Sequence, residues 1–254
     1  MKMKKLGLVL TAIACMGMIT ACGSKDSAKG DSKGEEKKTL VMATNAEFPP
    51  YEYYEGDEIV GIDAEFAAAI AEKLGMELKI EDMAFNSILS AVSSGKADLG
   101  VAGMTVDETR KKQVDFSDSY YTGRQVIIVK EDSDIAGPDG LEGKKIGVQE
   151  GTTGDIYTTD DFGDEAIERY NKGMEAVQAL AQGKIDAVVI DDQPAQTFVE
   201  QVEGLKVLEA EYAEEDYAIA LKKGNTELLE KVNAAIKELK EDGTFDEIVA
   251  KYIK

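Results

Sequence analysis

The chain has 254 residues, of which 43% are apolar and 31% charged, so it can build a core in one large or two small domains and is not disordered by composition. Its 50 acidic residues outnumber 29 lysines and arginines, and the resulting formal charge of −21 argues against nucleic-acid binding, because a phosphate backbone requires a basic surface. There is no histidine, and both cysteines, Cys15 and Cys22, lie near the N-terminus, which excludes histidine-dependent triads, histidine-ligated zinc and disulfides within the body.

Residues 1–21 have the pattern of an export signal. Three lysines among the first five residues precede an apolar run over 6–19, which is too short to span a bilayer comfortably. The run ends in Ile-Thr-Ala-Cys at 19–22, which resembles a bacterial lipobox, in which Cys22 receives a lipid and becomes the mature N-terminus. Cleavage would remove the three lysines and leave 26 basic and 50 acidic residues, a net charge of −24. An ordinary signal peptide with an incidental cysteine is the alternative.

Residues 22–38 are expected to form a flexible tether. Gly, Ser and charges of both signs dominate this segment, and it contains no large apolar residue. A chain of this composition and length has a root-mean-square reach of about 20–24 Å. The folded body is therefore expected to begin near Thr39.

The first half of the body alternates predicted strands and helices. Apolar residues at i, i+4 and i+8 mark the first helix, and a glycine follows each helix as a stop signal. The predicted elements are a strand over 40–44, a helix over 64–75 capped by Asp63, a strand over 76–80, a helix ended by Gly95 and a strand over 95–101.

The second half repeats this order. A Gly-Lys-x-Asp segment precedes an apolar strand at 95–98 and again at 183–186, at equivalent places in the two halves. Alternating strands and helices favour parallel sheets covered by helices, so the fold class is α/β with two lobes. The later predicted elements are a strand over 144–149, a helix over 175–181, a strand over 183–189 and C-terminal helices over 225–240 and from Thr244.

Open α/β sheets bind ligands where their strands end, so the residues that follow strands are candidates for a site. In the first half these are Ala102, Gly103, Met104 and Thr105, and a helix is expected to open near Arg110. The amides of Gly103 and Thr105, together with the Arg110 guanidinium, could bind a carboxylate. The alternative is an exposed Arg110 in an ion pair that contributes little.

In the second half the sequence Gly-Thr-Thr-Gly over 151–154 follows the strand that ends at Gln149. It opens a helix and could hold an anion, although it lacks the Gly-Lys-Ser/Thr ending of a P-loop. Asp191 follows the next strand, and Asp192 with Pro194 is suited to begin the helix after it. Asp191 is thus free to bind an ammonium group, or else it is a second capping residue.

Two aromatic residues accompany these groups. Asn45, Glu47 and Phe48 follow the first strand, and Phe85 opens a helix. Phe48 and Phe85 could enclose a ligand side chain, although core packing is the commoner role of a single phenylalanine. A carboxylate-binding arginine, an ammonium-binding aspartate and two aromatic walls together indicate an amino-acid site.

Over about residues 40–253 the chain resembles the polar amino-acid substrate-binding proteins of bacterial ABC transporters. Several ordered motifs carry this resemblance, among them Gly-Ile-Asp-Ala-Glu-Phe, which is similar to a signature of that family. The most specific stretches are 43–51, 61–66, 102–105 with Arg110, 115–121 and 147–152.

The resemblance implies a two-lobe fold of the type II periplasmic-binding-protein class. Each lobe is expected to be a mostly parallel sheet with flanking helices, and two crossover strands are expected to join the lobes. The implied boundaries are 39–119 and 218–254 for lobe one, 125–212 for lobe two, and 120–124 and 213–217 for the hinge.

The resemblance also assigns roles at the site. Arg110 is similar to the arginine that binds the ligand carboxylate, and Asp191 to the acid that pairs with its α-ammonium. The full set of ligand-binding residues expected is Asn45, Glu47, Phe48, Phe85, Ala102, Gly103, Met104, Thr105, Arg110, Gln149, Gly151, Thr152, Thr153 and Asp191.

The implied function is capture of a polar amino acid between the lobes and its delivery to an ABC-transporter permease. The protein is expected to be a monomer, lipid-anchored through Cys22 on the extracytoplasmic face of the cell membrane. It is not expected to be an enzyme, and neither a cofactor nor a bound metal is predicted. The acidic stretch 160–165 lacks the spacing of an EF-hand and is expected to be solvated.

Asn45 departs from a common family pattern, in which an aspartate at this position faces the cationic end of a basic ligand. An amide supplies hydrogen bonds without a charge, so the sequence favours a neutral polar ligand. The alternatives from other classes are a dehydratase-like enzyme that works with carboxylates on the same scaffold, and a ligand-binding sensor subunit.

Overall fold

The computed structural model describes residues 38–253. The predicted export signal, the acylation site at Cys22 and all of the tether except Lys38 lie outside the described residues. The first strand, β1 (Thr39–Thr44), begins where the folded body was expected to start. None of the helices in residues 38–253 has the length and apolarity needed to cross a membrane.

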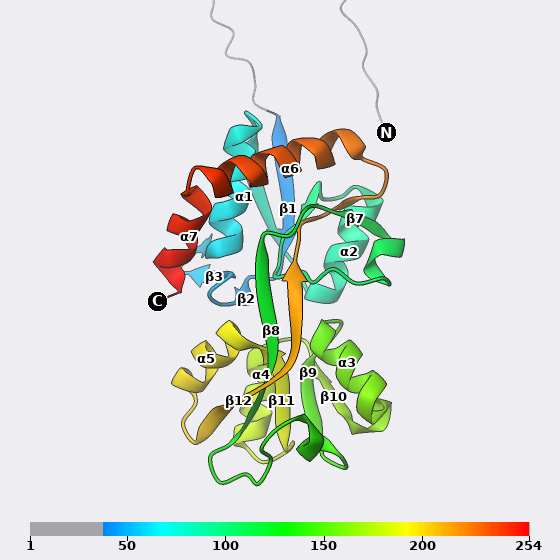
Figure 1. Cartoon of the computed structure of the whole chain (residues 1–254), viewed down its shortest axis with the longest axis vertical. Coiled ribbons are helices and arrows are strands. Elements are labelled where there is room, and N and C mark those ends of the chain that lie inside the picture. The colour runs from blue at the N-terminus through cyan, green and yellow to red at the C-terminus, as the bar shows by residue number, and fades with distance from the viewer. Residues whose placement is uncertain (1–37, 254) are drawn as a thin grey trace, which may run out of the picture. The chain divides into compact units, whose positions relative to one another are not determined.

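The first lobe is built on a five-stranded sheet. Its strands are β1, β5 (Glu77–Asp82), β6 (Leu99–Gly100), β7 (Val114–Phe116) and β13 (Ala220–Lys222), in the spatial order β5-β1-β6-β13-β7. The helices of this lobe are α1 (Ile62–Lys73), α2 (Phe85–Ser94), α6 (Thr226–Glu241) and α7 (Thr244–Tyr252). Figure 1 shows that the C-terminal helices α6 and α7 return to this lobe, where they pack on α1.

The second lobe repeats the arrangement. Its five strands are β8 (Tyr121–Lys130), β9 (Ile146–Gln149), β10 (Ile167–Tyr170), β11 (Ala187–Asp191) and β12 (Leu205–Tyr217), in the order β10-β9-β11-β8-β12. Its helices are α3 (Thr153–Phe162), α4 (Gly173–Ala181) and α5 (Asp192–Gln201), with 3-10 turns η2 (Pro138–Leu141) and η3 (Asp164–Ala166).

The prediction of mostly parallel sheets was wrong in detail. In each lobe three strands pair in parallel, while the other two pairings are antiparallel, so both sheets are mixed. The antiparallel strands enter each sheet from the crossover connections rather than from the strand-helix repeat. A small antiparallel sheet was also missed: β2 (Glu47–Phe48), β3 (Glu52–Glu55) and β4 (Glu58–Val60).

The repeated Gly-Lys-x-Asp segment has the same structural role in both lobes. The carboxylate of Asp98 accepts a hydrogen bond of 2.9 Å from the Val41 amide, and that of Asp186 accepts one of 2.8 Å from the Lys145 amide. In each lobe this bond ties the motif to the start of the neighbouring parallel strand. The motif is therefore a structural element of the repeat and does not contribute to a ligand site.

Two predicted helix starts differ from those observed. Helix α1 begins at Ile62 after Gly61, so Asp63 lies inside the first turn and does not cap it. Gly61 is required here because a Cβ atom would lie 2.3 Å from the Tyr51 carbonyl oxygen. At Arg110 the chain forms only the 3-10 turn η1 (Arg110–Lys112) in place of the expected helix.

Strands β8 and β12 run side by side between the two lobes (Figure 1). Their antiparallel register pairs Tyr121 with Tyr217 and Gln125 with Ala213, so the two segments expected to form crossovers lie next to each other. Gly123 allows this close pairing, since a Cβ atom there would lie 2.4 Å from the Tyr217 hydroxyl oxygen.

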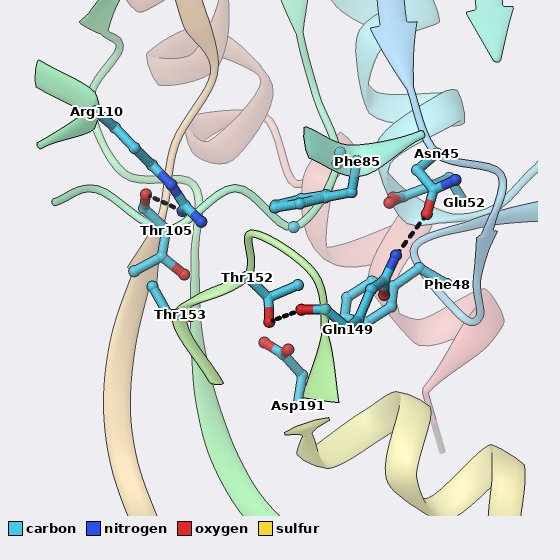
Figure 2. A pocket seen from close by; sticks show the side chains of 12 residues that line it. Asn45, Phe48, Glu52, Phe85, Thr105, Arg110, Gln149, Thr152, Thr153 and Asp191 are labelled. Atoms are coloured by element: carbon cyan, nitrogen blue, oxygen red, sulfur yellow. Dashed lines mark hydrogen bonds between the residues drawn. The ribbon is translucent and has the colours of Figure 1, made fainter. Parts of the chain in front are cut away.

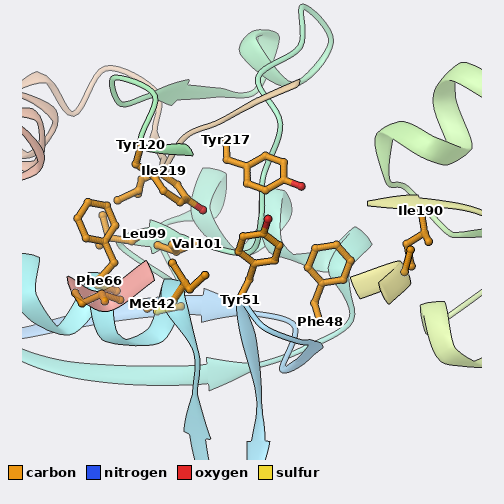
Figure 3. Close-up of a cluster of buried hydrophobic side chains, with 14 of the residues drawn as sticks. Met42, Phe48, Tyr51, Phe66, Leu99, Val101, Tyr120, Ile190, Tyr217 and Ile219 are labelled. Atoms are coloured by element: carbon orange, nitrogen blue, oxygen red, sulfur yellow. The ribbon is translucent and has the colours of Figure 1, made fainter. Parts of the chain in front are cut away.

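Beneath these crossover strands, aromatic side chains form part of the core of the first lobe (Figure 3). Tyr51, Tyr120 and Tyr217 are fully or almost fully buried, and the Tyr51 ring lies edge-on to that of Tyr217 at 5.4 Å. This packing fixes the base of the crossover next to the loops that follow β2 and β6.

Candidate ligand-binding site

A cavity of about 300 Å³ lies between the loops of the two lobes (Figure 2). Eleven of the fourteen predicted residues line it; Glu47, Met104 and Gly151 do not, and Glu52 is an addition. The lining residues are Asn45, Phe48, Glu52, Phe85, Ala102, Gly103, Thr105, Arg110, Gln149, Thr152, Thr153 and Asp191. In Figure 2, Arg110 and Thr105 lie at one end of the pocket, and Asn45 and Glu52 at the other.

Arg110 is buried and contacts both lobes. Its Nη1 donates to the Thr105 carbonyl at 2.7 Å, and its Nη2 donates to the Gly151 carbonyl at 3.1 Å. The Asp107 carboxylate lies 3.1 Å from Nε, and the guanidinium carbon lies 5.5 Å from the centre of the Phe85 ring. With only 3% of its surface exposed, Arg110 is not the exposed ion pair considered as the alternative.

The turn that holds Arg110 is built locally. The Asp107 carboxylate accepts from the amides of Thr109 and Arg110 at 2.6 and 3.1 Å, which closes the 3-10 turn. Burial lowers the pKa of Arg110, and the charge of Asp107 opposes this effect. The guanidinium therefore remains a cation that faces the pocket.

Hydrogen bonds to two buried carboxylates fix the loop after β6. The Gly103 amide donates to the Asp63 carboxylate at 2.7 Å, so it is not the bare amide that was expected, although Gly103 itself lines the pocket. The Thr105 hydroxyl donates to Glu215 at 3.0 Å. Gly103 has a φ of +52°, and a Cβ atom there would lie 3.0 Å from the ring of Phe48.

The loop after β9 opens helix α3, as predicted. Thr152 is the N-cap, and its hydroxyl oxygen accepts from the Asp155 amide at 3.3 Å. The Gly151 amide donates to the Asp155 carboxylate at 3.0 Å, while the Gly151 carbonyl faces Arg110. Thr152 and Thr153 therefore line the pocket at the N-terminus of helix α3.

Asp191 is the last residue of β11 and faces the pocket floor. It occupies the N-cap position of α5, one residue before the expected Asp192, but its side chain makes no capping hydrogen bond. The Tyr217 hydroxyl donates to its carboxylate. Burial, followed by the nearby charge of Glu215, raises the pKa of Asp191 to about 7. A cation at this carboxylate would restore its charge.

Glu52 is the residue that sequence reasoning missed. It is 1% exposed, and neither carboxylate oxygen has a hydrogen-bond partner among the described residues. Burial and the charge of Asp63 raise the pKa of Glu52 well above the ordinary glutamate value. Burial falls along β3 from Glu52, which is buried, to Tyr54 and Glu55, which are exposed, and the sequence Glu-Tyr-Tyr-Glu does not show which glutamate is inside.

Of the remaining predicted residues, Asn45 and Gln149 line the pocket, whereas Glu47 and Met104 do not. Across the pocket, the side-chain Nε2 of Gln149 donates to the side-chain Oδ1 of Asn45 at 2.9 Å. Glu47 lies outside the pocket and pairs with Lys172 of the second lobe. Met104 is fully buried.

The acidic stretch 160–165 is not part of the site. Asp161 accepts from the Tyr212 hydroxyl, and Asp164 pairs with Arg169 at 2.7 Å. Within residues 38–253 no group of three or more acidic or cysteine side chains has the geometry to hold a metal ion.

Comparisons with known proteins agree with this architecture. Residues 40–254 match the family model of bacterial extracellular solute-binding proteins, family 3. The chain is 39% identical to the arginine-binding extracellular protein ArtP of Bacillus subtilis, with 98% of each chain covered, and 31% identical to the glutamine-binding protein GlnH of the same organism, with 99% and 98% covered.

A solved structure of an ancestral arginine-binding protein bound to arginine superposes with a TM-score of 0.81 at 41% identity, covering 86% of this chain and 100% of that one. The two-lobe fold of the periplasmic-binding-protein class expected from the sequence is thereby confirmed. The chain belongs to family 3 of the bacterial extracellular solute-binding proteins.

Proposed function

We propose that this protein captures an amino acid between its two lobes outside the cytoplasm and delivers it to an ABC importer. The observation that carries the proposal is that Arg110 and Asp191 face one cavity from different lobes. A buried cation and a buried carboxylate in one pocket match the carboxylate and ammonium of a zwitterion. Arg110 would hold the α-carboxylate with the α3 N-terminus, and Asp191 the α-ammonium.

We propose L-arginine as the ligand. A ligand carboxylate at Arg110 would direct the ligand side chain toward the opposite end of the pocket (Figure 2). There the Glu52 carboxyl group has no hydrogen-bond partner among residues 38–253. A guanidinium placed there would receive both a charge and hydrogen bonds. The preference for a neutral ligand depended on Asn45 alone, whereas Glu52 supplies the carboxylate that Asn45 lacks.

Two relatives support the cationic ligand. The ArtP protein of Bacillus subtilis is described as arginine-binding, and the ancestral protein was solved with arginine bound. The related ancestral structure bound to glutamine, at 42% identity, makes a neutral amino acid the second candidate. The amides of Asn45 and Gln149 are suited to such a side chain.

Binding is proposed to close the two lobes about a hinge at 120–124 and 213–217. On this account lobe one comprises 39–119 and 218–254, and lobe two comprises 125–212. The Arg110–Gly151 and Asn45–Gln149 contacts join the lobes across the pocket. A ligand that contacts both lobes would shift the population toward the closed state, because it could make both sets of contacts only when the lobes lie close together.

The cellular setting is also part of the proposal. Cys22 would carry the lipid, and residues 22–38 would tether a monomeric body to the outer face of the cell membrane, where it meets its permease. We propose no catalytic step, so arginine should be recovered unchanged after incubation with the protein.

Calorimetry tests the proposed function. Titration of the purified protein with L-arginine should give one-to-one binding at micromolar affinity, about −8 kcal/mol. Glutamine and citrulline, which lack the cationic group, serve as matched ligands of similar shape. Failure of every amino acid to bind would overturn the proposal, and recovery of a converted product would favour the dehydratase alternative.

A further inference from the structure

The structure contains a buried carboxylate next to the pocket that the proposed ligand does not touch. Asp63 is fully buried, and its hydrogen-bond partners are uncharged: the Gly103 amide at 2.7 Å and the Tyr120 hydroxyl at 2.8 and 2.9 Å. No lysine or arginine of the described residues pairs with it. A buried charge that lacks a cation requires a reason for its presence.

Asp63 lies where three segments meet. The Gly103 amide belongs to the pocket loop, and Tyr120 directly precedes the crossover strand β8, where its own amide donates to the Tyr217 carbonyl at 2.9 Å. The backbone amide of Asp63 donates to the Tyr51 carbonyl at 2.8 Å. This bond places the start of α1 against the residue next to Glu52.

Glu52 is therefore the carboxyl group that neighbours Asp63 inside the pocket wall. After burial, the charge of Asp63 has the largest effect on the pKa of Glu52, and Asp191 adds to it. Burial raises the pKa of Asp63, and the hydrogen bonds from Gly103 and Tyr120 oppose this effect because they favour the charged form. No group in residues 38–253 donates a hydrogen bond to the Glu52 carboxyl group. Two buried carboxyls in this position cannot both ionise readily, so the one with donors holds the charge.

We infer that Asp63 is a positioning residue that sets the ligand preference of the pocket, because its carboxylate holds the Gly103 loop and keeps Glu52 protonated until a cationic ligand arrives. The inference rests on the proposed function. When a guanidinium binds, the Glu52 O–H bond breaks, the proton passes to solvent and the carboxylate pairs with the ligand. When the cation leaves, Glu52 takes the proton back. A neutral side chain would meet Glu52 as a hydrogen-bond donor.

The isosteric variant Asp63→Asn separates charge from shape. Its side-chain oxygen can still accept from Gly103, while the negative charge is lost. Carbon-13 spectra of carboxyl-labelled glutamate in the ligand-free protein, with Glu52 assigned by Glu52→Gln, report its titration directly. We expect the Glu52 midpoint in Asp63→Asn to fall toward the ordinary glutamate range. Asp155→Asn, the matched change under the other pocket loop, should leave it unmoved.

Calorimetry in two buffers of different ionisation enthalpy then counts the protons released when L-arginine binds. The wild-type protein should release about one proton more than Asp63→Asn when it binds arginine. Its affinity should therefore rise with pH by about tenfold more per pH unit than the affinity of Asp63→Asn does. If Asp63→Asn does not fold, Tyr120→Phe removes a donor to Asp63 and should lower the Glu52 midpoint in the same direction.

The outcomes separate the two ideas. If the wild-type protein binds arginine but Glu52 titrates identically in all variants, the role of Asp63 is overturned while the proposed function stands. If no amino acid binds, the proposed function fails, and the carbon-13 titration still decides whether Asp63 controls Glu52. A merely structural role for Asp63 would lower stability without changing the proton count.

Discussion

In each of the two loops that face the ligand pocket, a glycine amide donates a hydrogen bond to an aspartate carboxylate, but the two aspartates differ in their place in the fold. In the first lobe the Gly103 amide donates to Asp63, which is forty positions away in the chain and is fully buried. In the second lobe the Gly151 amide donates to Asp155, four positions away, which pairs with the exposed Arg169 at 2.9 Å. One loop is thus fixed by the tertiary fold, and the other by the first turn of its own helix.

Arg110 is the group that joins the two loops. It donates to the Thr105 carbonyl in one and to the Gly151 carbonyl in the other. The loop that carries Gly151 is thus held by a residue of its own helix, whereas the loop that carries Gly103 is tied through Asp63 to Tyr120, directly before a crossover strand. Substitutions of single residues can remove the parts of this arrangement one at a time.

The largest effect is expected from Arg110→Ala, which removes the carboxylate partner and the bridge between the loops. Arginine affinity should fall by about 3 kcal/mol, or about a hundredfold, in calorimetry. Arg110→Lys keeps the positive charge but loses the planar guanidinium, so its affinity for arginine should lie between those of the wild-type protein and Arg110→Ala. Unchanged affinity in the alanine variant would remove Arg110 from the site.

Asp191→Asn should weaken binding by about 2 kcal/mol, because the ligand ammonium loses its charged partner. Since folding raises the pKa of Asp191 to about 7, the folded state binds this proton more tightly than the unfolded state does. The ligand-free protein should lose stability as pH rises from about 4 to 7 through this group, whereas arginine binding should strengthen over the same range.

Thermal unfolding at several pH values checks this sign. Asp191→Asn should flatten the pH dependence of the ligand-free protein and raise its Tm at pH 8. A Tm that rises with pH between 4 and 7 by an amount that Asp191→Asn abolishes would contradict the assignment.

A pair of glycine variants compares the two loops directly. Both Gly103 and Gly151 have positive φ, so alanine at either should cost about 1–2 kcal/mol. The added Cβ of Gly103→Ala meets Phe48 at 3.0 Å within one lobe, whereas that of Gly151→Ala meets Asn86 at 3.2 Å across the lobes. Gly151→Ala should therefore weaken arginine binding more than Gly103→Ala does, while the two variants lower the Tm of the ligand-free protein by similar amounts.

The reverse pattern, with Gly151→Ala acting on stability alone, would show that Gly151 and Asn86 do not approach when the lobes close. Gly163→Ala is a matched control, because Gly163 also has a positive φ but has open space around its Cβ position.

The smallest effect is expected at the rim of the pocket. Glu47 and Lys172 form an exposed ion pair between the lobes, so Lys172→Ala should reduce arginine affinity by about 0.5 kcal/mol. The difference from wild type should disappear at 1 M salt, because exposed charges are screened. A larger loss that persists in salt would mean that this pair takes part in binding itself.

Much of the fold was predictable because its signals are local. The helix that Gly95 ends, the cap at Thr152 and the C-terminal helices all follow from residues within a few positions of one another. The family resemblance supplied the order of the lobes, and the matched family and solved structures confirm the fold.

The site was predictable where a residue follows a strand and not where tertiary contacts decide. Aspartate is a common N-cap residue, which is why Asp63 was expected to cap the helix. Its carboxylate instead accepts a hydrogen bond from the Gly103 amide, a contact that exists only in the folded chain. Glu52 is buried at the start of β3, whereas Glu55 at its end is exposed, and nothing in the local sequence distinguishes the two glutamates. Both errors concern charged groups whose burial cannot be read from their neighbours in the chain.

The most direct test is calorimetric titration of the purified protein with L-arginine and with agmatine, which is arginine without its α-carboxylate. The account predicts one-to-one micromolar binding of arginine and no measurable binding of agmatine, because the carboxylate is what Arg110 and the α3 N-terminus hold. Equal affinity for the two compounds, or no heat from arginine at millimolar concentration, would contradict it.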